Sequence, residues 1–358
     1  MNAFRRPVFT LPARFFVTVA TLLPFVPARA QVVSPPSTVG PVVPSIVVPL
    51  VPPPTSPPRI VAVPRQVQDT EEFDRIIADD RTPPETRVVN ISVLARIKTY
   101  EPLHMGFVIA GTSQRTVLLR ASSGGLRAFG ITEPAVIPVM DVYNSTGGLI
   151  ISHSGVFSPA VIRANARVGG LFDDVHQSAI VMTLPAGAYS IRVWDLTYGY
   201  TLPAMPGLIL PRVDGFALAE VYDIAGGADA QLSNASTLGR VAATEGGAIV
   251  GFVLLGQVSR RLVMRGVGPG LAVFRVGETL AEPSIVLRNG NGTVLASNNG
   301  VIRGETATMA AAAGAFPLPA NSRDAAFDVT LASGAYTVQL DSPRPESGLG
   351  LLELYSVP

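Results

Sequence analysis

Cysteine is missing from all 358 residues of this chain. Its absence excludes disulfide bonds, thiolate metal sites, cysteine nucleophiles and a lipid-modified N-terminal cysteine. Histidine is scarce, and His104, His153 and His176 stand at spacings that match no metal-ligand pattern. No His-Glu-x-x-His or Gly-x-Ser-x-Gly motif occurs. The sequence therefore predicts no catalytic residue, no metal site and no cofactor, and favours a protein that is not an enzyme.

Long apolar runs are absent outside the N-terminus. There, three arginines precede the apolar residues 15–26, and Ala-Arg-Ala at 28–30 offers a cleavage site. The apolar run is too short to cross a hydrocarbon core of roughly 30 Å as a helix. We expect a signal peptide at 1–30 and a bacterial protein exported to the periplasm, the cell surface or the medium, with no membrane span in the mature chain. Arg5-Arg6 leaves the twin-arginine route open beside the general one.

The mature chain carries no excess of positive charge. Loss of the four arginines of the signal peptide leaves 23 basic residues against 26 acidic ones. Because a slightly acidic protein is not attracted to a phosphate backbone, no nucleic-acid partner is expected.

Proline is concentrated in residues 31–64, which hold 11 of the 32 prolines. Proline cannot donate to a strand ladder or continue a helix, so we expect an extended linker or stalk of up to ~100 Å. A docking ligand for a proline-binding groove is the alternative. Residues 65–86 then form a connecting segment, in which "TEEFDRIIADD" at 70–80 predicts one short helix.

The remaining chain is a duplication. Residues 106–156 align without a gap with residues 251–301, and 16 of the 51 positions are identical. Upstream of these segments, "NISVLAR" at 90–96 is similar to "NASTLGR" at 234–240. Two copies of ordinary domain size follow, module 1 at 87–226 and module 2 at 227–358.

Each copy alternates short β-rich runs with turn signals. Asn-Gly-Asn-Gly at 289–292 is typical of a hairpin, since asparagine and glycine tolerate positive φ. One short helix is expected in each copy, near 160–167 and 306–313. The pattern predicts an all-β fold of two tandem antiparallel β-sandwich modules, jelly-roll or immunoglobulin-like.

The clearest repeat is "LPAGAYSIRVWD" from Leu184 and "LASGAYTVQLDS" from Leu331. In the first, Tyr189, Ile191 and Val193 alternate with polar residues, the period of a strand with one buried face. The copies share this apolar face and differ at the polar positions. We therefore interpret the repeat as a core strand built twice, not as a site used twice.

Several stretches together suggest a family. "VMRGVGPGLAVF", "AEPSIVLRNGNGTVLASNN" and "DAAFDVTLASGAYTVQL" resemble the tandem β-sandwich modules of uncharacterised secreted bacterial proteins. The resemblance covers most of residues 87–358 and implies extracellular modules with no established activity. "LPAGAYSIRV" alone also resembles one strand of bacterial pre-peptidase C-terminal domains.

Three charged positions recur in both copies inside expected strands. An unpaired charge near a core is costly, so a charge repeated at a strand position suggests pairing. We expect one structural arginine–glutamate contact in each copy. The positions are Arg96 with Arg240, Arg120 with Arg265, and Glu220 with Glu353.

One aromatic group belongs to the first copy alone. "WDLTYGYTLP" brings Trp194, Tyr198 and Tyr200 together around a glycine turn. Flat rings on a loop suit stacking on sugars or anchoring a protein partner.

These observations predict a non-catalytic, adhesion-like exported protein whose partner is a cell-surface protein or a polysaccharide. The alternative is a carbohydrate-binding protein that uses the aromatic group of the first copy. An enzyme of unknown class comes third.

Overall fold

The computed structural model describes residues 63–82, 85–98, 101–131, 137–155, 158–169, 177–195, 214–242, 247–300 and 302–357. The expected signal peptide and almost all of the proline-rich segment lie outside these residues, so both stay predictions. Within the described residues, no helix is long and apolar enough to cross a membrane.

Antiparallel pairing joins the described strands into two runs. The first run is β1 (Arg65–Val67), β7 (Gln177–Leu184), β4 (Arg115–Ser122), β9 (Asp214–Gly226), β2 (Arg87–Lys98), β11 (Ile249–Leu255), β16 (Gly334–Asp341), β13 (Ser284–Asn289) and β14 (Val294–Asn298). The second run is β6 (Leu149–Ser154), β5 (Pro138–Asn144), β8 (Gly187–Asp195), β3 (Leu103–Ala110), β10 (Gln231–Val241), β17 (Gly348–Ser356), β12 (Arg260–Val267) and β15 (Ala325–Leu331). A single bridge from Leu232 to Val88 connects the runs. The expected all-β, antiparallel fold is confirmed.

One apolar core lies between the two runs. Val93 and Phe252 come from the first run, while Phe107 and Leu354 come from the second, and all four are buried in the same cluster. Burial alternates along β3, whose residues are buried at every second position. The two runs therefore face each other across a shared core, as layers of a β-protein do.

The repeated stretch forms β8 in one copy and β16 in the other. The ring of Tyr189 stacks on Phe107 with centroids 5.5 Å apart, and its hydroxyl donates to the carbonyl four residues earlier at 2.8 Å. In the second copy Tyr336 stacks on Phe252 at 5.4 Å and donates in the same way at 2.9 Å. The repeated tyrosine thus fills the core and closes the turn before its strand, which confirms the expected buried face.

Short helices cover the outer faces of the strands. They are α1 (Thr70–Ala78), α2 (Pro159–Val168), α3 (Gly304–Ala312) and the 3-10 helices η2 (Gly124–Phe129) and η3 (Pro269–Phe274). The side chain of Asp69 caps the start of α1 by accepting from the backbone N–H of Glu72 at 2.7 Å. Phe73 then packs in one cluster with Leu118 of β4 and with residues of α2. The strands around β4 are therefore buried on both faces.

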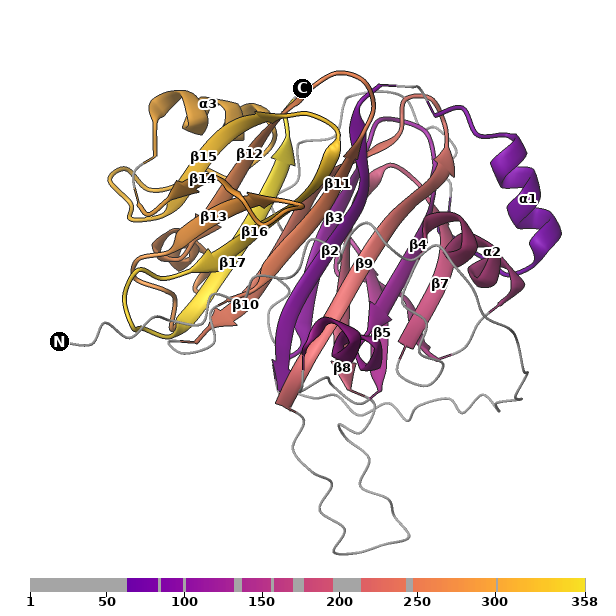
Figure 1. Ribbon diagram of the computed structural model, residues 1–358, viewed down its shortest axis with the longest axis horizontal. Helices are drawn as coiled ribbons and strands as arrows, with labels where there is room; N and C mark the ends of the chain where they lie inside the picture. Colours follow the sequence, from indigo (N-terminus) through magenta and orange to yellow (C-terminus); the bar gives the residue numbers. More distant parts are fainter. Residues whose placement is uncertain are drawn as a thin grey trace, which may run out of the picture.

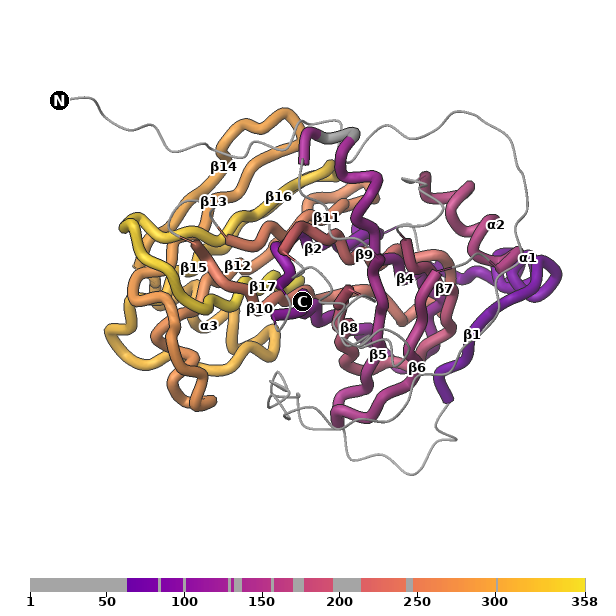
Figure 2. Tube along the Cα trace, turned by 90° about the horizontal axis from the view of Figure 1, so that it is seen from below, coloured from indigo at the N-terminus to yellow at the C-terminus, as the bar shows by residue number. Residues whose placement is uncertain are grey.

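Beside the single bridge from Leu232 to Val88, two continuous strand ladders join the copies, and we call these two ladders the seam. β2 pairs with β11, and β3 pairs with β10. In the duplication β2 corresponds to β10 and β3 to β11, so each copy contributes the same two strands. Figures 1 and 2 show the copies side by side, the indigo-to-magenta strands on one side and the orange-to-yellow strands on the other.

The two halves of the seam have the same register. Gly251 lies opposite Ser92 in one ladder, and Gly106 lies opposite Ser236 in the other. Each ladder then shifts register at the equivalent point of β2 and of β10. A contact in which both partners use the same surface is the mark of a twofold arrangement, here within one chain.

Candidate functional site

The repeated charges of the first copy meet beneath α2. Arg120 Nε donates to Glu220 Oε2 at 2.6 Å, and Arg120 Nη1 donates to Asn165 Oδ1 of α2 at 2.9 Å. Arg120 Nη2 donates to the hydroxyl of Tyr222 at 2.8 Å, and that hydroxyl donates to Glu220 Oε1 at 2.6 Å. Burial and the nearby carboxylate raise the pKa of Tyr222. Every charged atom of this network has a partner inside the protein.

The second copy repeats the contact with different surroundings. Arg265 Nε donates to Glu353 Oε2 at 2.9 Å, and Arg265 Nη1 donates to the carbonyl of Phe316 at 2.6 Å. The hydroxyl of Tyr355 donates to Glu353 Oε1 at 2.7 Å. Burial raises the pKa of Glu353, and the charge of Arg265 opposes that rise.

The other pair of repeated arginines, Arg96 and Arg240, lies elsewhere. Arg96 forms an ion pair with Asp214. Arg240 donates to Glu278 at 2.9 Å and to Glu101 at 3.3 Å. Both arginines lie near the surface, so they sit apart from the buried glutamate contacts.

Sequence reasoning missed a buried arginine between the copies. Arg115 is 1% exposed; its Nε pairs with Asp223, and its Nη1 donates to the carbonyl of Ala230 at 2.9 Å. Arg115 aligns with Arg260, but Asp223 aligns with Ser356, so the search for repeated acids did not find the pair. This contact fixes the short connection from β9 to β10.

The glycine-rich stretch "GVGPGL" at 266–271 follows β12. It leads into η3, and the N–H groups of Gly268 and Gly270 donate to the buried carboxylate of Asp324 at 2.7 and 3.0 Å. The backbone donors of the loop thus hold an anion, but that anion belongs to the chain itself.

The expected aromatic group is only partly within the described residues. Tyr198 and Tyr200 lie outside them. Trp194, at the end of β8, is partly buried, and its Nε1 donates to Asp141 Oδ2 at 3.0 Å. The ring is therefore fixed on the outer face of the second run, next to β5.

Asp141 is the centre of a polar group on that outer face. Arg192 donates to Asp141 Oδ2 through Nε at 3.1 Å and through Nη2 at 2.6 Å. The hydroxyl of Tyr143 donates to the same oxygen at 3.3 Å, and the hydroxyl of Ser152 donates to Oδ1 at 2.6 Å. The guanidinium of Arg192 also lies over the Tyr143 ring, 5.6 Å from its centroid. We call Asp141, Tyr143, Ser152, Arg192 and Trp194 the outer-face cluster.

His104 lies on the neighbouring strand β3, beside Arg192 of the outer-face cluster. It stands opposite Arg192 in the pairing of β3 with β8. Burial, aided by the charge of Arg192, lowers the pKa of His104 to about 4. His104 is therefore neutral at pH 7. In copy two, Ile249 occupies the equivalent position and packs on Leu94 across the seam.

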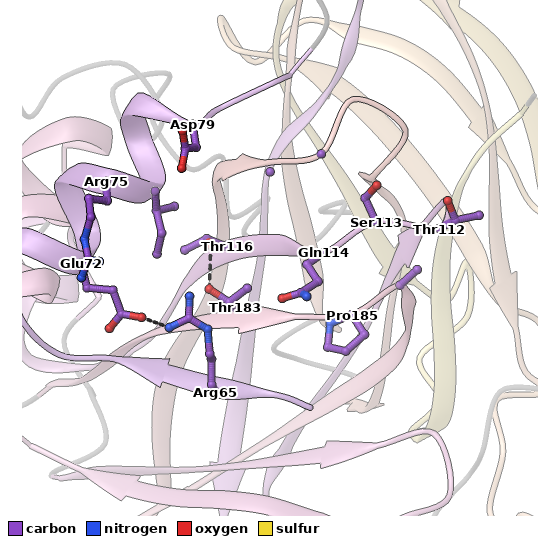
Figure 3. Close-up of a pocket in the computed structure, with 14 residues that line it drawn as sticks. Arg65, Glu72, Arg75, Asp79, Thr112, Ser113, Gln114, Thr116, Thr183 and Pro185 are labelled. Atoms are coloured by element: carbon purple, nitrogen blue, oxygen red, sulfur yellow. Dashed lines mark hydrogen bonds and ion pairs between the residues drawn. The ribbon is translucent and has the colours of Figure 1, made fainter. Parts of the chain in front are cut away.

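A second candidate is an open cleft of 1220 Å³ between α1 and the ends of β4 and β7 (Figure 3). Arg65 forms an ion pair with Glu72 at its edge, and the hydroxyls of Thr116 and Thr183 hydrogen-bond to each other at 2.8 Å on its floor. Within each of these two pairs the polar groups satisfy one another.

No family model matches this chain. The search of curated proteins also found no match. Among solved structures, the one described as "Crystal Structure of the STIV MCP" is 10% identical, with 74% of this chain and 95% of that chain covered and a TM-score of 0.18. So low a TM-score carries no argument about fold or function.

Only the geometry of the candidate residues in this structure therefore bears on their role. Across the described residues, no three histidine or acidic side chains are grouped so that they could hold a metal ion. The outer-face cluster combines hydrogen-bonded rings, a half-exposed arginine and a serine hydroxyl on one face of β5, β6 and β8. Rings held in place beside hydroxyls and an arginine are groups that can bind a ligand.

Proposed function

We propose that this chain is a non-catalytic exported protein with a structural or interaction role, formed by two β-sandwich modules at residues 87–226 and 227–358. The observation that carries the proposal is the seam, in which both ladders have the same register. Backbone pairing on both sides of the seam holds the modules as one body. Such a body presents its outer faces in a fixed orientation to a partner in the cell envelope or outside it.

The repeated charges support this role. Arg120 and Arg265 are buried, and each is neutralised by a glutamate of its own copy. Duplication has thus preserved groups that hold strands together beneath a helix. A duplicated enzyme would be expected to retain matching polar groups in an accessible cavity.

The test begins with the full chain, tagged at its C-terminus and produced in its source cells. Mass spectrometry of the mature N-terminus is expected to find Gln31 in the envelope or medium. An uncleaved chain in the cytoplasm would contradict export.

A second measurement addresses the interaction. Crosslinking and capture in intact cells, with the full chain and with a variant lacking residues 31–64, is expected to recover an envelope component in both cases. Recovery by neither form, despite correct export, would contradict an interaction role for the modules.

A further inference from the structure

The outer face of β5 and β8 differs in chemistry between the two copies. The strand pairing around this face is equivalent in both copies, so the backbone arrangement does not impose the difference. Asp141, Tyr143, Arg192 and Trp194 correspond to Val286, Arg288, Gln339 and Asp341. From this contrast we propose that the outer-face cluster of copy one is a binding site for neutral polysaccharide.

The two rings of the cluster are held in place before any ligand arrives. Asp141 is 3% exposed and accepts from both Trp194 Nε1 and the Tyr143 hydroxyl. A ring fixed by a hydrogen bond loses little rotational freedom on binding. The apolar C–H face of a pyranose stacks on such a ring, so the cluster provides a platform for sugar units.

Polar groups on the same face complete the site. The side chain of Arg192 is 43% exposed; its Nε and Nη2 bind Asp141, and among the described residues its Nη1 has no hydrogen-bond acceptor. Ser152, Ser154 and Ser190 are exposed around it. Sugar hydroxyls both donate and accept, so an arginine N–H and serine hydroxyls match them.

The charge of the site decides which polysaccharide it fits. Asp141 and Arg192 neutralise each other at 2.6 Å, so the cluster has no net charge. A polyanion would have to compete with Asp141 for Arg192 and would meet a carboxylate. A neutral polysaccharide neither competes with Asp141 for Arg192 nor is repelled by the carboxylate.

The inference rests on the proposed function in one respect, that the protein binds without catalysis. Trp194 is the sole tryptophan of the chain, so its fluorescence reports on the cluster directly. The probes are hydroxyethyl cellulose, amylopectin and galactomannan as neutral polymers, and alginate as the polyanion. At least one neutral polymer is expected to shift the emission of the full mature chain and to retard it in an affinity gel.

Two variants and a matched control locate the site. Trp194→Ala is expected to weaken gel retardation about tenfold, since it removes a stacked ring. Arg192→Gln, which introduces the residue that copy two has at Gln339, is expected to weaken it several-fold while the tryptophan stays. Asp341→Ala changes the position equivalent to Trp194 in copy two and is expected to leave retardation unchanged. Circular dichroism checks that each variant is folded.

The outcomes separate the two proposals. If none of the neutral polymers binds, or if Trp194→Ala and Arg192→Gln retain full retardation, the site is overturned while the structural role stands. Equal or stronger binding of alginate, lost in high salt, also overturns it. Release of new reducing ends from a bound polymer would contradict the non-catalytic role and leave the site in place.

Discussion

A disulfide engineered across the seam tests the arrangement of the two copies. Gly106 and Ser236 face each other in the pairing of β3 with β10. A Cβ built on Gly106 would lie 3.7 Å from the Cβ of Ser236, within the 3.5–4.5 Å typical of a disulfide. The chain has no cysteine, so Gly106→Cys with Ser236→Cys introduces the sole thiols.

The expected gain follows from the loop that the bond closes. Cross-linking positions about 130 residues apart removes unfolded-state entropy worth up to about 5 kcal/mol. The reduced protein should instead be less stable than the parent by about 1–3 kcal/mol, because the Cβ added at position 106 crowds the side chain at position 236. Urea unfolding with and without reductant, together with a non-reducing gel, measures both changes.

A matched control makes the result decisive. Ser152 is exposed on β6, which three strands separate from β10 in the same run, so Ser152→Cys with Ser236→Cys should stay reduced within the chain. Our reasoning fails if the seam pair forms no intrachain bond, or if the control pair oxidises as readily.

Two further predictions concern buried charge. Arg265→Met leaves the carboxylate of Glu353 buried without its cation and should cost about 3–5 kcal/mol in urea unfolding at pH 7, and adding Glu353→Leu should restore most of that loss. The pKa of His104 is about 4 in the folded chain against 6.5 for the free side chain, so the unfolded chain binds the proton first. The stability that neutral His104 contributes is therefore complete well above pH 6.5 and falls as the pH drops towards 4, by up to about 3 kcal/mol. His104→Ile, which copies Ile249, should remove that part of the pH dependence.

A specific result would contradict each of these two predictions. An exposed pair serves as the control for the first, since Arg163→Met breaks a contact with Asp74 whose side chains are about half exposed and should cost under about 1 kcal/mol. If Arg265→Met costs no more than this control, the buried pair does not act as described. If His104→Ile and the parent lose stability in parallel from pH 7 to 4, His104 does not titrate as its surroundings indicate.

Much of the fold could be predicted because strand alternation and sequence repetition can be identified from short segments of the chain. Alternation in the repeated stretch placed Tyr189 and Ile191 in the core, and both are buried. The repeated charges pointed to Arg120 and Glu220 because a buried charge needs a partner wherever the strand recurs. In both cases short-range periodicity or repetition within the chain holds the information.

The seam and the outer-face cluster depend on contacts that no local rule specifies. Nothing in β2 shows that its neighbour is β11, more than 150 residues later, rather than β3. Trp194 was singled out as a ring on a loop, but its hydrogen bond to Asp141 follows from the pairing of β5 with β8. The Arg115–Asp223 contact escaped because only the arginine recurs in the second copy.

The twofold seam also bears on how the two copies came to differ. In a dimer of identical chains, every substitution appears twice, so a change that suits one subunit is imposed on the other. Joining both copies in one chain removes that constraint, and the connection at residues 227–230 also keeps them together at any dilution. Asp141 and Trp194 of copy one can therefore differ from Val286 and Asp341 of copy two, so that a symmetric backbone frame carries two outer faces of different chemistry.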